Sequence, residues 1–228
     1  MTFWERIGAQ LRRPHGRSGE ALAAVMRVVN AAAYRAALKA LALQAGETVL
    51  EVGCGGGDGV AALLRCKPEA VVGLDASATM IARARRRNGG AVAAGLLDLI
   101  EADAAAIPLA SNSVDAVLAV NVAYFFDDPG CLQEIHRVLK PGGRVVLYVS
   151  DRSVMQSWPF AGAETHRLYD AASLRAALVE AGFATGSTRV VRLRVGGVPG
   201  LVAVGLRAQA GTRDRSEDRS DCGRILSH

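Results

Sequence analysis

The segment VLEVGCGGGDG, residues 49–59, decides the fold of this chain. It begins with the apolar alternation of a buried strand and ends in a loop with five glycines in seven residues. Glycine loses more backbone freedom on folding than any other residue, so this loop is costly unless something must approach its backbone closely. Acidic residues lie on both sides, at Glu51 and Asp58. We therefore predict a ligand that rests on bare backbone and carries a cationic group.

The composition indicates one globular domain. The chain has 228 residues, of which 50% are hydrophobic and 21% charged, enough for one sizeable core. No apolar run reaches the ~20 residues of a membrane span, and Glu5 and Arg6 interrupt the N-terminus where a signal peptide would be apolar. We expect a cytoplasmic protein without a bound metal, because the four cysteines form no C-x-x-C pair. These cysteines are Cys54, Cys66, Cys131 and Cys222.

The net charge of +5 and the pI of about 9.3 leave room for a nucleic-acid partner. The arginines are dispersed, however, apart from one cluster at Arg83, Arg85, Arg86 and Arg87. That cluster falls late in an expected helix, where cations complement the helix dipole. We interpret it as a solvated helix end and expect no nucleic acid to bind.

Beyond residue 45, apolar strands alternate with helical patterns. Strands are expected over 48–52, 70–74, 97–101, 114–120 and 144–149, and helices over 60–65, 78–87, 131–139 and 171–181. This alternation predicts βαβ units and a parallel sheet with helices on both faces. Two later apolar runs, 188–195 and 198–206, are joined by two glycines and predict an antiparallel hairpin at the sheet edge.

The domain organisation follows from these patterns. Residues 1–45 carry a helical stripe that begins near Ser18 and are expected to form a cap or lid. Residues 46–207 form the main domain. Residues 208–228 have almost no apolar pattern and are expected to be a disordered tail.

The glycine loop does not match the dinucleotide fingerprint G-x-G-x-x-G/A. Counted from Gly53 the sixth residue is Asp58, and counted from Gly55 it is Val60. Two further acids follow the next two expected strands. Asp75 is placed to accept hydrogen bonds from a ribose diol, and Asp103 to accept from an exocyclic amine such as that of adenine.

Four motifs together resemble the class I S-adenosylmethionine-dependent methyltransferases of small-molecule type that are found in bacteria. They are VLEVGCGGG (49–57), VVGLDAS (71–77), EADAAAIPLASNSVDAVLAV (101–120) and EIHRVLKPGGRVVL (134–147). The resemblance implies a Rossmann-like α/β fold with a seven-stranded, mostly parallel sheet and an antiparallel C-terminal hairpin. It also implies S-adenosylmethionine as the cofactor. The turn at 139–143 is interpreted as structural, with glycine at the end of a helix.

The resemblance implies a role for each matching residue. Glu51 and the backbone of Gly53, Gly55 and Gly57 would hold the methionine end of the cofactor. Asn121, just beyond the strand 114–120, would offer a carbonyl to the methionine ammonium.

The nucleoside end of the cofactor is assigned in the same way. Asp75 would accept from the ribose hydroxyls while Ala76 lies against adenine. Asp103 would accept from the adenine amine, and the Ala104 N–H would donate to the ring.

The loop NVAYFFDDPG is the expected wall of the acceptor site. Tyr124 and Phe125 would cover a planar or apolar acceptor, whereas Phe126 is expected in the core. The loop is similar to the N/D-P-P-Y motif of methyltransferases acting on bases, but Val122 and Ala123 replace both prolines. This departure argues against methylation of nucleic acid.

The candidate catalytic residues are His166 and Tyr124. His166 lies in ETHRLYD with Tyr169, a segment that often faces the acceptor in similar enzymes, and histidine is suited to proton transfer near pH 7. Tyr34, on the first helix, belongs either to a lid or to a helix that only packs on the sheet.

The expected function is methyl transfer from S-adenosylmethionine to a small organic or lipid-like acceptor. The alternatives are a methyltransferase acting on RNA or protein, and a nicotinamide-dependent reductase or non-catalytic nucleotide-binding module. The sequence indicates neither the acceptor nor the oligomeric state.

Overall fold

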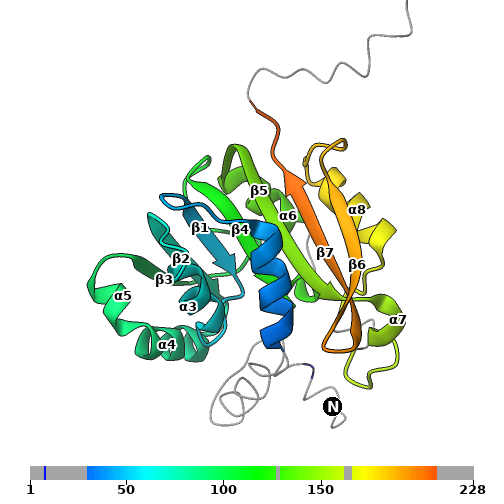
Figure 1. Cartoon of the computed structure of the whole chain (residues 1–228), viewed down its shortest axis with the longest axis horizontal. Coiled ribbons are helices and arrows are strands. Elements are labelled where there is room, and N and C mark those ends of the chain that lie inside the picture. The colour runs from blue at the N-terminus through cyan, green and yellow to red at the C-terminus, as the bar shows by residue number, and fades with distance from the viewer. Residues whose placement is uncertain (1–7, 9–29, 127–128, 162–165, 210–228) are drawn as a thin grey trace, which may run out of the picture.

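The computed structural model describes Gly8 and residues 30–126, 129–161 and 166–209 (Figure 1). Seven strands of this part form one sheet in the order β3-β2-β1-β4-β5-β7-β6. The strands are β1 (Thr48–Val52), β2 (Ala70–Asp75), β3 (Leu97–Glu101), β4 (Val114–Val120), β5 (Leu139–Ser150), β6 (Arg189–Val195) and β7 (Val198–Leu206). The helices are residues 30–41, α3 (Asp58–Leu64), α4 (Ala78–Arg87), α5 (Gly89–Ala93), α6 (Gly130–Val138), α7 (Arg152–Met155) and α8 (Ala171–Glu180), with the 3₁₀ turn η1 (Ala123–Phe125).

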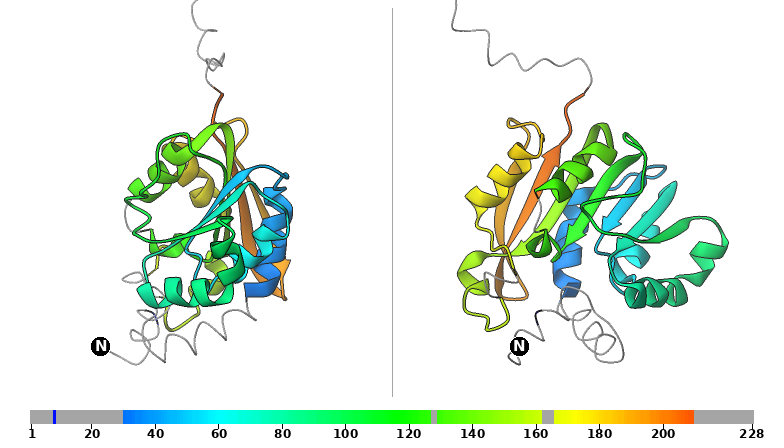
Figure 2. Two further views of the ribbon diagram at one scale, coloured as in Figure 1. Left: turned by 90° about the vertical axis from the view of Figure 1, so that its left-hand side faces the viewer. Right: turned by 180° about the vertical axis from the view of Figure 1, so that it is seen from behind.

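The sheet separates two hydrophobic cores. Helix 30–41, α3 and α4 pack on one face, and α6, α7 and α8 pack on the other (Figures 1 and 2). Alternation along β1 divides its side chains between the two, so Val49 enters the first core while Leu50 and Val52 enter the second. No helix of the described part is both long and apolar enough to cross a membrane.

The order of the strands reverses next to β1. This strand pairs in parallel with β2 on one side and with β4 on the other. In an open α/β sheet such a switch point creates a crevice at the carboxyl ends of the strands. The glycine loop follows β1 and Asn121 follows β4, so both open onto this crevice.

The predicted α/β fold and hairpin are confirmed, with strand and helix bounds mostly within two residues of the prediction. β7 pairs antiparallel with both β5 and β6, and Gly196 and Gly197 make the turn with φ of 58° and 83°. Four of the five predicted parallel strands lie over the stated ranges, give or take one residue. The predicted helix start at Ser18 lies outside the described residues.

Residues 139–143 follow the end of a helix and lead into the fifth strand, as predicted, but the predicted place of glycine at the helix terminus was wrong. Leu139 is the C-cap of α6, which ends at Val138, but Gly142 and Gly143 are not at the helix end, because residues 139–143 form the first part of β5. They bulge outward, because Val114 pairs with Leu139 whereas Ala116 already pairs with Arg144. Gly142 permits the bulge through its φ of 81°, and its N–H donates to the carbonyl of Arg207 at 3.0 Å.

Arg144 joins three elements at the end of the sheet opposite the crevice. Its guanidinium makes a two-pronged ion pair with Glu47, with distances of 2.8 and 2.6 Å. It also donates to the carbonyls of Leu41 and Ala42, the last residues of helix 30–41 and its turn. The helix that covers the crevice face is thereby tied to β1 and β5.

We expect Arg144→Met to lower the free energy of unfolding by about 2–3 kcal/mol, because several charge-assisted hydrogen bonds are lost at once. Urea denaturation monitored by circular dichroism measures this. Arg35→Met, at an exposed position of the same helix, is the control and should stay within about 0.5 kcal/mol of the parent. Equal midpoints for both variants would contradict the assigned role.

Candidate functional site

Glu51 is a buried acid on the helix-covered face of the sheet. It lies two residues after Val49 on β1, so strand alternation directs both side chains toward helix 30–41 and α3. The residue is 0% exposed. A carboxylate in such a place is unfavourable unless other groups compensate its charge.

The surroundings of Glu51 compensate it only in part. The hydroxyl of Tyr34 donates to Oε1 at 2.8 Å, whereas Oε2 is buried and accepts no hydrogen bond in the described structure. Burial raises the pKa of Glu51 to about 8, with the negative charges of Asp75 and Asp58 adding to the effect and the Tyr34 bond opposing it. The site therefore lacks a hydrogen-bond donor and a positive charge.

The glycine loop wraps around this acid. Gly53, Gly55 and Gly57 have φ of 71°, 50° and 81°, a region that side chains rarely adopt. A Cβ on Gly53 would lie 2.5 Å from Cγ2 of Val122, so glycine is required there for packing. A Cβ on Gly55 would meet nothing within 4 Å, because this glycine faces open space.

Two contacts that the sequence did not suggest hold the loop in place. Gly59, in the first turn of α3, lies so close to Glu51 and Tyr34 that any side chain would collide with both. The amide of Asn88 donates to the carbonyls of Gly57 at 3.1 Å and Ala84 at 3.0 Å. Asn88 thus joins the end of α4 to the loop. Because Asn88 and Gly57 are far apart in the chain, the sequence alone does not indicate this contact.

Asp75 organises the loop from the neighbouring strand. Its Oδ2 accepts from the Gly55 N–H at 2.8 Å, and its Oδ1 accepts from the Ser77 N–H at 2.9 Å. A carboxylate has about four acceptor positions, so these bonds leave room for a ligand hydroxyl. Ala76, between the two contacts, is half-buried beside them.

Asp103 and Ala104 lie at the next strand end. The Ala102 N–H donates to the carbonyl of Asp75 at 3.2 Å, which brings this segment beside Asp75. Asp103 is exposed, and its Oδ1 accepts from the Ala105 N–H at 2.9 Å. The three predicted acids are therefore gathered at the carboxyl ends of β1, β2 and β3.

Asn121 connects the covering helix with the strand ends. It adopts φ of 54°, and its amide donates to Oδ1 of Asn30 at 2.8 Å. Its Oδ1 accepts from the hydroxyl of Tyr124 at 2.8 Å, and that hydroxyl in turn accepts from the Ser150 N–H. Burial raises the pKa of Tyr124, so its hydroxyl stays protonated at neutral pH. Asn30 and Ser150 were not anticipated from sequence.

Aromatic rings gather next to this network. The ring of His166 lies 4.8 Å from that of Phe125, 6.0 Å from Tyr124 and 6.2 Å from Phe160, measured between centroids. His166 is buried, with 5% exposed. Phe125 and Phe160 are half-buried, so this aromatic cluster has an accessible side.

Two further aromatic residues of the sequence analysis lie in the core. Phe126 is 3% exposed, which confirms its predicted core position. Tyr169, expected near the acceptor with His166, is 1% exposed. It is thus His166 rather than Tyr169 that the fold brings to the aromatic cluster.

Comparisons with known proteins find methyltransferases of similar fold. Residues 50–147 match the family model described as a methyltransferase domain. Over these residues the chain is similar to a methyltransferase domain. The Haloferax volcanii methyltransferase solved in complex with the Trm112 activator has a TM-score of 0.72 at 20% identity, covering 92% of this chain and 99% of that one.

Sequence relatives also include methyltransferases. The chain is 36% identical to cycloartenol-C-24-methyltransferase 1 of Oryza sativa over 109 residues, 47% of this chain and 32% of the relative. It is 36% identical to a ubiquinone/menaquinone biosynthesis C-methyltransferase of Geobacter sulfurreducens over 116 residues, 50% of this chain and 45% of the relative. The chain thus spans less than half the length of these relatives.

The residues of the crevice fit S-adenosylmethionine. A Haemonchus contortus phosphoethanolamine N-methyltransferase solved with S-adenosylhomocysteine shares the fold, with a TM-score of 0.65 at 18% identity over 77% of this chain and 52% of that one. In the present structure, the unpartnered Oε2 of Glu51 suits the ammonium of the cofactor. The open side of Gly55 suits close approach of a ligand to backbone.

Without ligand, Glu51 should make stability fall as pH rises. Its pKa is about 8 in the folded chain against 4.5 in the reference state, so its contribution is complete below pH 4.5 and is lost as pH rises to about 8. As pH rises from 5 to 9, we expect the parent to lose about 2–4 kcal/mol of unfolding free energy relative to Glu51→Gln. Urea denaturation of both proteins at several pH values measures the difference. If the unfolding free energies of the two proteins changed with pH in the same way, Glu51 would not be a buried acid that is neutral at low pH.

Proposed function

We propose that the protein transfers a methyl group from S-adenosylmethionine to a small organic or lipid-like acceptor. The observation that supports this most is the buried, half-satisfied carboxylate of Glu51 beside a glycine loop at the switch point of the sheet. When bound, S-adenosylmethionine supplies an electrophilic methyl group. The residues of this chain bind the cofactor, orient the acceptor and exclude water.

The cofactor-binding residues are proposed from the crevice and the family motifs. Glu51 and Asn121 would hold the amino-acid end, with the backbone of Gly53, Gly55 and Gly57. The nucleoside end would be held by Asp75, Ala76, Asp103 and Ala104. Asp75 would do so while it keeps the Gly55 N–H in place, which couples loop geometry to ribose binding.

The aromatic cluster supports the proposal of a small acceptor. Phe125 and Phe160 offer apolar faces, and His166 lies between them within the same cluster. Apolar walls exclude water and hold a nucleophile in line with the methyl group, and positioning supplies much of the rate in such reactions. The hydroxyl of Tyr124 is engaged on both sides, so we assign it to positioning Asn121.

The relatives support the same acceptor class without naming the acceptor. The curated names of two relatives refer to cycloartenol and to ubiquinone or menaquinone biosynthesis. A small apolar acceptor is consistent with the accessible side of the aromatic cluster.

Gly55→Val should abolish binding of S-adenosylhomocysteine, because a side chain would occupy the open side of the loop. Gly46→Val is a matched control: Gly46 also has positive φ, 81°, and a Cβ there also meets nothing within 4 Å, but it precedes β1 at the other end of the strand. Calorimetric titration should show binding by the control only. A folded Gly55→Val protein that binds as tightly as the parent would refute the site.

We propose His166 as the general base for acceptors that carry a proton. His166→Gln should lower kcat by about 100-fold and leave the affinity for S-adenosylhomocysteine unchanged. His136→Gln is the control, since that ring packs edge-on against Phe183 at 5.0 Å. Full kcat in the His166 variant would remove this residue from the chemistry.

The acceptor class is tested with methyl-labelled S-adenosylmethionine and a deproteinised extract separated by molecular mass. Label in the low-mass fraction would support the proposal and provide the product for identification. Label only in RNA, or only in protein added separately, would replace it with a macromolecular acceptor.

A further inference from the structure

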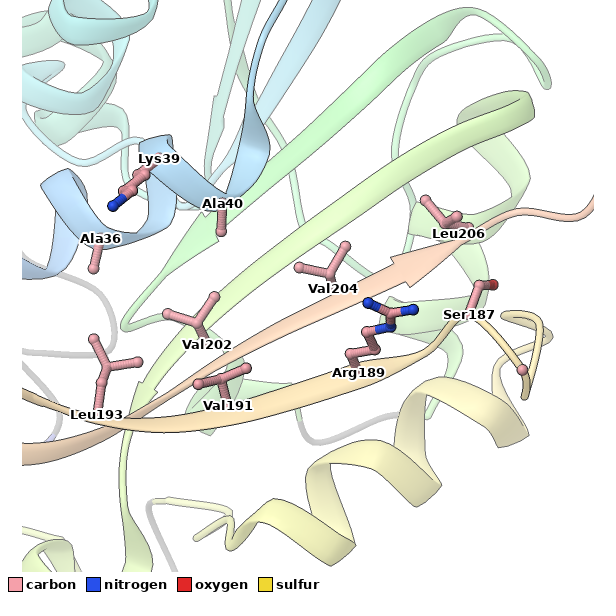
Figure 3. Close-up of a pocket in the computed structure, with 11 residues that line it drawn as sticks. Ala36, Lys39, Ala40, Ser187, Arg189, Val191, Leu193, Val202, Val204 and Leu206 are labelled. Carbon is pink, nitrogen blue, oxygen red and sulfur yellow. The ribbon is translucent and has the colours of Figure 1, made fainter.

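A groove of about 750 Å³ runs along the face of β6 and β7 beside helix 30–41 (Figure 3). It lies at the hairpin edge of the sheet, away from the glycine loop, which follows β1. In the described part of the chain no helix covers this face, whereas α8 packs against the other face (Figures 1 and 2).

The floor of the groove is apolar because of strand alternation. Val191 and Leu193 of β6 and Val202 and Val204 of β7 point to the same side (Figure 3). Val191 is 58% exposed, one of two large hydrophobic side chains in the described structure that are strongly exposed. The floor from residue 189 to residue 193 is about 13 Å long at the usual rise of a strand.

The two cations of the groove have no acidic partner in the described part of the chain. Lys39 lines it from the helix and Arg189 from β6 (Figure 3). Neither forms an ion pair or a side-chain hydrogen bond within the described residues. The neighbouring arginines of β6 differ, since Arg192 pairs with Asp151 at 2.9 Å and Arg194 donates to the carbonyl of Gly197 at 3.1 Å. Within the described structure, the groove side of β6 therefore combines apolar surface with positive charge that has no acidic partner there.

We propose that this groove binds a single-chain anionic amphiphile of the fatty-acid type. The alkyl chain lies on the valine and leucine floor, and the carboxylate pairs with Arg189 at one end of that floor, while Lys39 adds positive charge from the helix side of the groove (Figure 3). The volume is in the range of small-molecule sites, and a recess between a helix and a sheet suits one chain better than a flat membrane surface. This site is separate from the crevice, so the inference does not depend on the proposed function.

Dansyl-undecanoate, a fluorescent fatty acid, is the probe, used with the full chain below the concentration at which it forms micelles. We expect saturable binding, displacement by dodecanoate, and displacement by dodecan-1-ol only at about tenfold higher concentration. Binding to phosphatidylglycerol vesicles without binding of the monomeric probe would overturn the proposal, as would the absence of saturable binding.

Variants at exposed positions locate the site. Arg189→Gln should weaken probe binding about fivefold and Val191→Asp at least tenfold, while Arg194→Gln, with the same charge change on the opposite face of β6, should have no effect. Affinity for S-adenosylhomocysteine, measured in parallel, should be the same in all four proteins. The proposal would be overturned if the parent, Arg189→Gln and Val191→Asp bound the probe equally. It would also be overturned if none of the proteins bound the probe and Val191→Asp converted a dimeric parent to a monomer.

Discussion

The central constraint of this structure is one carboxylate removed from water. Glu51 lies on β1, an interior strand of the sheet, so its place is fixed by the sheet itself, and Tyr34 donates to only one of its two oxygens. A buried acid of this kind either keeps its proton or acquires a cationic partner. The fold thus maintains a site that is incomplete without a ligand bearing positive charge.

The other elements of the crevice depend on the same position. Gly59 has no side chain because Glu51 and Tyr34 occupy that space, and this allows α3 to begin directly against β1. Helix 30–41 contacts the crevice twice, through Tyr34 on Glu51 and through Asn30 on Asn121. A ligand that changes the charge of Glu51 therefore also acts on the docking of this helix, which makes the helix part of the site.

Local pattern was enough to predict the strands, the hairpin and the three acids at the strand ends, because alternation and glycine placement are properties of adjacent residues. The partners of those acids were not predictable in this way. The contacts Tyr34–Glu51, Asn30–Asn121 and Asn88–Gly57 join residues far apart in the chain, and only the packing of helices on the sheet brings them together. The bulge at Gly142 was not predictable for the same reason, because its N–H bonds to the carbonyl of Arg207, the residue that follows β7.

The most direct test of the account compares calorimetric titrations of S-adenosylhomocysteine and 5′-methylthioadenosine, which shares the nucleoside but lacks the amino-acid end. If Glu51 recognises the ammonium, S-adenosylhomocysteine binds about 10- to 100-fold more tightly, the scale of a hydrogen bond to a charged group, and Glu51→Gln removes most of that difference. Equal affinities of the two ligands for the parent protein, or an undiminished difference in Glu51→Gln, would contradict the account.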